Sequence, residues 1–191
     1  MSQFEFLIIL AGVVIGIAMA EIVGGWGRIV RAQAKLELDW LQFGWTVVIL
    51  LNAMIYWVGI WPYADVGIQY MGQVYFLVVP TLFLVIISFA ITPTDFTSTP
   101  FSIRDYYMER RKPIFLCYAA FFMTSQAADY LTGVSSITYS ETAIDLAIVL
   151  PNLYLAFTRN IWAHGLLMVG LFVILVGAGF ATLEQMGGLV R

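Results

Sequence analysis

The chain has 191 residues, of which 61% are hydrophobic and only 11% are charged. A typical soluble domain carries about 25% charged residues, so this chain lacks the polar surface that a soluble enzyme or binding domain presents to water. The charged residues are divided between two sides of the protein, so the formal net charge of −3 says little about its partners. We expect a lipid bilayer around the protein and no nucleic-acid partner.

Six long apolar stretches follow one another along the sequence. Most of them reach the ~20 residues that a helix needs to cross ~30 Å of hydrocarbon. The connections between them are short, and no stretch is large or polar enough to form an extramembrane domain. We therefore predict an all-α bundle of six transmembrane helices in a single domain over residues 1–191, with helices at 6–26, 40–60, 68–91, 113–133, 143–157 and 161–183.

The Lys and Arg residues fall in alternate gaps between these stretches. The first gap holds three of them, the third gap four and the fifth gap one, whereas the second and fourth gaps hold none. Basic residues accumulate on the cytoplasmic side of membrane proteins. We therefore expect the odd gaps in the cytoplasm and both termini on the far side, with the bacterial inner (cytoplasmic) membrane as the location.

The third gap is expected to carry a short amphipathic helix at the membrane interface, over residues 103–111. Ser102 stands three residues before Asp105, which is the spacing of a helix cap. The Tyr106–Tyr107 pair and the basic residues 110–112 suit the headgroup zone, where aromatic rings straddle the interface and cations meet anionic lipid. The first gap consists of good helix formers, so the first helix is expected to continue beyond the membrane surface.

The first apolar stretch carries small residues at four-residue spacing: Gly12, Gly16, Ala20 and Gly24. Such a stripe lets another helix approach backbone to backbone. The sequence predicts tight packing there, and the partner is either another helix of the same chain or a second copy. We accordingly expect a homo-oligomer or a subunit of a larger membrane complex.

The fifth apolar stretch carries the most suggestive polar pattern. Asp145, Asn152 and Arg159 are spaced by seven and share one helix face at the outer, middle and inner depth. Pro151 removes the amide that would bond the carbonyl of Ala147, which leaves a polar backbone group at mid-membrane. Together with Gln126 and Asp129 of the fourth stretch, this face is a candidate permeation path. The alternative is that these side chains only hold neighbouring helices together.

Glu21 and His164 are the remaining ionisable groups within the apolar stretches. Arg28 is the same-face neighbour of Glu21 two turns further on, which suggests an ion pair. Glu21 and His164 have similar expected depths, so a contact between them is a candidate proton or ion pair. The single histidine excludes bis-histidine haem ligation within one chain, and the lone Cys117 supplies no metal cluster.

Enzyme signatures are absent from the sequence: it contains no zinc-protease motif, nucleophile elbow or phosphate loop. We therefore expect no enzymatic activity and identify no cofactor or metal site. Two functions of different classes remain open. The first is a permeation protein (a channel or transporter) for ions or small solutes that acts as a homo-oligomer, and the second is a non-enzymatic accessory subunit that docks into a larger membrane complex.

Overall fold

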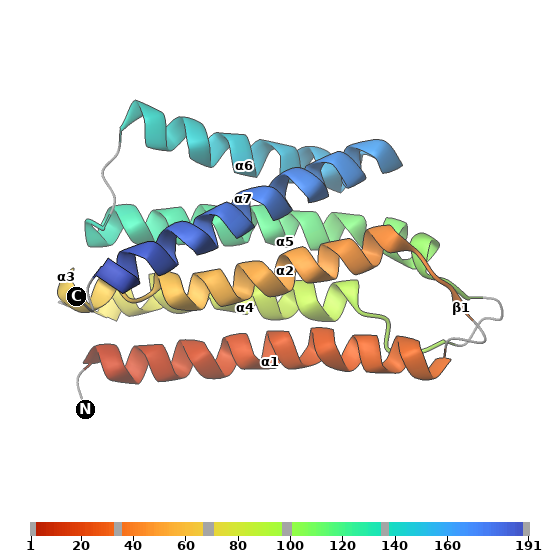
Figure 1. Cartoon of the computed structure of the whole chain (residues 1–191), viewed down its shortest axis with the longest axis horizontal. Helices are drawn as coiled ribbons and strands as arrows, with labels where there is room; N and C mark the ends of the chain where they lie inside the picture. The colour runs from red at the N-terminus through yellow and green to blue at the C-terminus, as the bar shows by residue number, and fades with distance from the viewer. Residues whose placement is uncertain (1–2, 33–35, 67–70, 97–100, 135–137, 189–191) are drawn as a thin grey trace.

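A computed structural model describes residues 3–32, 36–66, 71–96, 101–134 and 138–188. Within these ranges, the side chains of residues 3, 36, 65–66, 71–72, 139–141, 144–145 and 181–188 are outside the description. Six long helices run along the bundle, joined by short connections (Figure 1). They are α1 (Gln3–Ala32), α2 (Trp40–Gly59), α4 (Met71–Ile91), α5 (Ile103–Thr132), α6 (Tyr139–Phe157) and α7 (Ile161–Gly188).

Three short elements complete the described fold. A single helical turn, α3 (Tyr63–Val66), follows α2. The strands β1 (Leu36–Glu37) and β2 (Phe101–Ser102) pair in parallel. This two-residue pairing joins the connection after α1 to the connection before α5. Because all the other described elements are helices, the predicted all-α class is confirmed.

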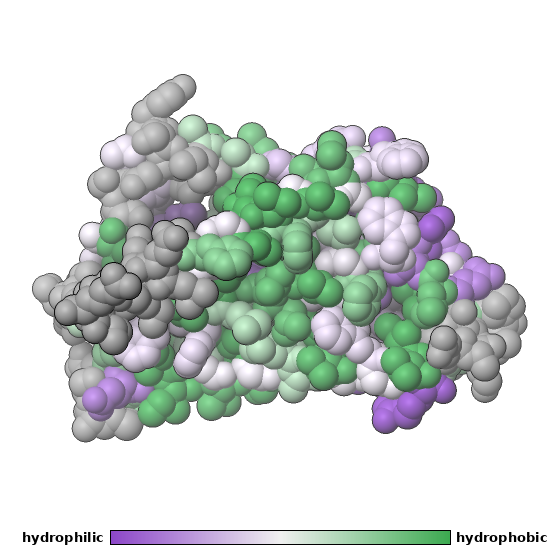
Figure 2. Space-filling view, viewed as in Figure 1, coloured by the Kyte–Doolittle hydropathy of each residue, from purple (hydrophilic) through white to green (hydrophobic). Residues whose placement is uncertain are grey.

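Among the described helices, four are long and apolar enough to cross a membrane. Large apolar side chains such as Val13, Trp162 and Leu166 are exposed along them, and Figure 2 shows hydrophobic residues over the middle of one face, with hydrophilic residues gathered toward the ends. This surface and these helices are those of a membrane protein. The four candidate spans are Phe4–Ala32, Trp40–Gly59, Gln73–Ile91 and Ile161–Phe180.

The helices pack in a defined order. The middle of the bundle is α4, which packs against α1 on one side and α5 on the other, while α6 packs along α5 and α7 packs along α2. In contrast, α6 and α7 meet near the connection that joins them and diverge toward their other ends (Figure 1). The N-terminal end of α1 and the C-terminal end of α7 lie at the same end of the bundle.

The structure corrects the expected interfacial helix. Residues 103–111 form the first turns of α5 rather than a separate helix, because Pro113 is accommodated inside the helix. Pro113 has no amide hydrogen and cannot donate the usual helical hydrogen bond. Nearby, the Arg111 guanidinium donates to the carbonyl of Met108 at 2.6 Å. The cap itself is as predicted: the Ser102 side chain accepts a hydrogen bond from the amide of Asp105 at 3.2 Å.

The same end of the bundle is fixed by Asp39. Its side chain caps α2 by accepting from the amide of Leu41 at 2.7 Å and also forms an ion pair with Arg104 of α5. The Asp39 carboxylate is buried in this arrangement, whereas Arg104 is about half exposed. As predicted, α1 continues past the apolar stretch, to Ala32, before the chain turns back into α2.

Candidate functional site

A cavity of about 110 Å³ lies where α6 and α7 face α2. It is lined by Trp45 of α2, by five residues of α6 between 147 and 155, and by four residues of α7 between 167 and 174. The separation of α6 from α7 opens this space. At its rim, Ala147, Gly170 and Ile174 are exposed, so the cavity opens on the apolar outer surface of the bundle.

Two residues that line this cavity each carry a buried polar atom with no hydrogen-bond partner among the described residues. These atoms are Nε1 of Trp45 and Oδ1 of Asn152. Trp45 is 1% exposed and Asn152 is 4% exposed, so neither atom is solvated by bulk water. Buried polar groups are normally hydrogen-bonded, because an unmade bond costs about 1–3 kcal/mol.

Local packing holds both side chains in place. The Trp45 ring meets Phe115 edge-on, with ring centroids 4.8 Å apart, and Tyr118 edge-on at 6.3 Å. The amide nitrogen of Asn152 donates to the carbonyl of Ile148 at 2.9 Å. That bond uses one donor of the amide and leaves the Oδ1 acceptor without a partner among the described residues.

Pro151 adds a third polar feature to the wall. It lies inside α6 and carries no amide hydrogen, so the carbonyl of Ala147 loses its usual helical donor. Both residues line the cavity. The lining contains no charged or titratable side chain among the described residues, which suits hydrogen bonding to a neutral group rather than acid–base chemistry or ion coordination.

The proposed permeation residues do not converge on one route in the described structure. Asn152 lines the cavity, Arg159 is exposed in the connection after α6, and Gln126 is half-buried on α5. Asp129 accepts a short hydrogen bond from the hydroxyl of Tyr63 in α3. The side chain of Asp145 lies outside the described residues.

Tyr63 is one of the residues whose role the sequence did not indicate. Burial first, and the nearby Asp129 carboxylate second, raise the pKa of the Tyr63 hydroxyl well above its ordinary value. It therefore stays protonated and acts as a donor, and this bond ties the turn after α2 to the C-terminal half of α5. This hydrogen bond gives Asp129 a structural role, which is an alternative to the predicted role in permeation.

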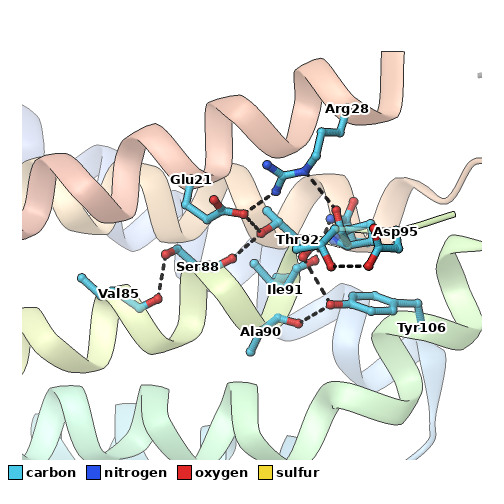
Figure 3. Close-up of polar contacts among 12 residues, drawn as sticks. Glu21, Arg28, Val85, Ser88, Ala90, Ile91, Thr92, Asp95 and Tyr106 are labelled. Carbon is cyan, nitrogen blue, oxygen red and sulfur yellow. Dashed lines mark hydrogen bonds and ion pairs between the residues drawn. The ribbon is translucent and has the colours of Figure 1, made fainter. Parts of the chain in front are cut away.

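Glu21 and His164 are not brought together. Glu21 forms the expected ion pair with Arg28 and also accepts a hydrogen bond from the hydroxyl of Thr92 at 2.8 Å (Figure 3). His164 is fully buried and pairs instead with Tyr107. The expectation of a Glu21–His164 contact is thus corrected, because Glu21 bonds to Thr92, directly after α4, while α5 presents Tyr107 to His164.

The Glu21–Arg28 pair belongs to a polar cluster around the C-terminal end of α4. The last carbonyls of a helix lack intrahelical partners, and here neighbouring elements supply them. Gln42 of α2 donates to the carbonyl of Ile91, the last residue of α4, at 3.0 Å, and Arg28 of α1 donates to that of Pro93, two residues beyond the helix, at 3.2 Å. Tyr106 of α5 donates to the carbonyl of Ala90 at 3.1 Å (Figure 3). The cluster therefore joins four helices at one end of the bundle.

The small-residue stripe of α1 is mostly turned outward. A side chain added at Gly16 would meet open space, one added at Gly24 would meet only Arg28 of its own helix, and Ala20 is exposed. Gly12 alone faces another helix, since an added Cβ would lie 3.3 Å from Nε1 of Trp57. Packing through the stripe within the chain is thus limited to Gly12, because the inward face of α1 carries Ala11, Ile15, Ala18 and Ile22.

Trp45 is the residue of the cavity that sequence reasoning missed. The other five tryptophans of the sequence lie near the ends of apolar stretches, where interfacial aromatic belts form. Trp45 lies deeper in its apolar stretch than Trp40 does. This depth could have marked Trp45 as a candidate site residue, because a buried indole requires a hydrogen-bond acceptor.

Comparisons of the chain with protein-family models, curated proteins and solved structures found no match. Its function therefore has to be inferred from the arrangement of its own residues.

Proposed function

We propose that the chain is a six-pass permeation protein for small solutes in a bacterial inner membrane. All six long helices, α5 and α6 included, run along the same bundle axis (Figure 1). The 19 residues of α6 rise about 28 Å, close to the thickness of the hydrocarbon layer. Both termini are proposed to lie outside, with the basic residues of the first, third and fifth connections in the cytoplasm.

The cavity beside α6 is the observation that carries this proposal. Asn152 is the residue that the seven-residue polar pattern places at mid-membrane. It lines the cavity, and its buried Oδ1 atom has no hydrogen-bond partner among the described residues. A side chain that served only to hold helices together would bond across to a neighbouring helix. Asn152 instead bonds within α6, and its acceptor has no partner among the described residues.

The lining narrows the range of solutes. Apart from Trp45, Asn152 and the backbone, the walls are apolar, and a charge in such surroundings costs about 3 kcal/mol or more. We therefore propose that neutral solutes pass and that ions are excluded.

The outward stripe at Gly16 and Ala20 is proposed to pack against a second copy of the protein, as in small-xxx-small contacts.

Flux measurements in proteoliposomes test the proposal. Stopped-flow light scattering would compare glycerol and urea entry into protein-containing and protein-free vesicles, with K⁺ flux measured in parallel. We expect faster entry of a neutral solute, loss of that entry in Asn152→Leu, and no added K⁺ flux. Asn52→Leu is the matched control, because Asn52 is an equally buried asparagine, on α2, that does not line the cavity.

The accessory-subunit function is the second candidate, and one observation favours it. Val13, Gly16, Ile17 and Ala20 form an exposed face of α1 with space for a partner helix, and that helix need not come from the same protein. Unmodified protein that moves neither neutral solutes nor ions would remove the permeation proposal and leave this one.

A further inference from the structure

The two partnerless atoms of the cavity specify complementary chemistry. An indole nitrogen only donates a hydrogen bond, and an amide oxygen only accepts one. Both atoms are buried, both belong to residues that line the same cavity, and neither has a hydrogen-bond partner among the described residues. A single hydroxyl group satisfies both at once, because its oxygen accepts from Nε1 of Trp45 while its hydrogen is donated to Oδ1 of Asn152. A carbonyl or an ether oxygen would satisfy Trp45 alone.

The walls and the opening indicate what the hydroxyl is attached to. Leu155, Leu167 and Leu171 line the cavity with apolar surface, and two exposed lining residues of α7, Gly170 and Ile174, lie on the outer surface of the bundle. A cavity of about 110 Å³ is somewhat smaller than the ~150 Å³ engineered apolar cavity that binds benzene. Its occupant is therefore no larger than one small ring or a short branched chain, with any longer part extending through the rim into lipid.

Building on the proposed function, since it concerns the same cavity, we propose that this site binds a neutral, lipid-soluble alcohol or phenol. The hydroxyl lies between Trp45 and Asn152, and the apolar body lies against α6 and α7. The ligand enters sideways from the bilayer through the gap between these two helices. Binding at equilibrium needs no transport, so the two proposals are separable.

Fluorine NMR of the protein in lipid nanodiscs tests the site, with 4-fluorophenol as the probe and 4-fluoroanisole as its comparison. The two probes differ in the hydroxyl donor, which the methyl ether lacks. We expect saturable binding of 4-fluorophenol to the unmodified protein and at least tenfold weaker binding of 4-fluoroanisole. Trp45→Phe and Asn152→Leu are each expected to weaken 4-fluorophenol binding about tenfold, since one lost hydrogen bond of about 1.4 kcal/mol corresponds to a factor of ten.

Trp57→Phe is the matched control, because Trp57 lies on the same helix outside the cavity. We expect this variant to bind 4-fluorophenol as the unmodified protein does.

Equal binding of the two probes would overturn the inference and leave water as the hydrogen-bond partner of the two polar atoms. Unchanged affinity in both Trp45→Phe and Asn152→Leu would also overturn it. Should Asn152→Leu fail to fold, the comparison of the two probes on unmodified protein still decides. Phenol binding without solute flux would uphold the site and remove the permeation proposal, whereas flux without phenol binding would do the reverse.

Discussion

The hydroxyl of Tyr107 lies 2.7 Å from Nδ1 of His164, and neither side chain is exposed. The other ring nitrogen, Nε2, lies 3.3 Å from the carbonyl oxygen of Thr158. Because a carbonyl only accepts hydrogen bonds, Nε2 carries a proton, and in the neutral ring Nδ1 then accepts from the Tyr107 hydroxyl. The pair thus joins the first turns of α5 to the start of α7, and its two partners specify the Nε2-protonated tautomer of the neutral His164 ring.

Tyr107→Phe is expected to remove the Nδ1 partner and to lower stability by about 1–3 kcal/mol, because it leaves a buried acceptor unsatisfied. Since His164 is the single histidine, ¹⁵N-histidine labelling gives one pair of ring signals. We expect a protonated Nε2 and an acceptor Nδ1 in the unmodified protein, with the Nδ1 signal moving in the variant. Tyr106→Phe is the control, since Tyr106 bonds to α4 instead. A protonated Nδ1 in the unmodified protein would contradict the assignment.

Glu21→Gln is expected to lower thermal stability by about 1–2 kcal/mol, because Arg28 loses its ionic partner at the end of α4. Arg28→Gln should cost a similar amount, and the double variant should cost less than the two added together, as residues in contact couple energetically. Thermal unfolding of the four proteins in detergent measures this. Arg31→Gln serves as the control on the same helix, because Arg31 is exposed. Additive losses would show that the two side chains act independently.

Substitutions at two glycines of α1, Gly25 and Gly16, are expected to have different effects on stability and assembly. A Cβ at Gly25 would lie 2.6 Å from Cγ2 of Thr92, so Gly25→Ala should destabilise the fold by about 1–3 kcal/mol through overpacking. A side chain at Gly16 meets open space, so Gly16→Leu should leave thermal unfolding unchanged and shift the protein to a smaller oligomer. Light scattering with size-exclusion chromatography measures the second effect. A Gly16→Leu variant that unfolds as early as Gly25→Ala would mean that the stripe packs within the chain.

The periodic and local features of this fold were predictable from sequence. Helix positions follow from apolar stretches, the cap at Ser102 follows from its spacing to Asp105, and the Glu21–Arg28 pair follows from helical geometry within α1. Each of these depends only on residues close together in the chain. Pro113 shows the limit of such reasoning, because a proline inside a long helix is tolerated here and the predicted helix boundary was wrong.

Features that depend on which helices are neighbours were not predictable. Tyr107 and His164 are 57 residues apart, and nothing in either segment indicates that α5 and α7 meet there. The same holds for Trp45 and Asn152, which share a cavity only because α6 and α7 diverge. The expected depth of Glu21 and His164 was a sound reason to compare them, but depth does not specify which helix a side chain faces.

The proposed orientation has its own test, in a Cys117→Ala background. Cysteines introduced at Ser2 and Arg191 should react with a membrane-impermeant maleimide from outside intact cells, because the basic residues lie in the odd connections. A cysteine at the exposed Thr94 should react only after the membrane is opened. The reverse pattern would invert the orientation, and labelling of the two termini from opposite sides would exclude six crossings.

Blocking the cavity at its rim is the most direct test of its role in permeation. Gly170 lines the cavity, and a side chain there meets open space, so Gly170→Cys in a Cys117→Ala background should fold and conduct normally. Reaction with benzyl methanethiosulfonate should then abolish neutral-solute flux in proteoliposomes. The same treatment of Val173→Cys, which is exposed on α7 outside the cavity, should leave flux intact. Undiminished flux through fully labelled Gly170→Cys protein would contradict the assignment of this cavity as the route.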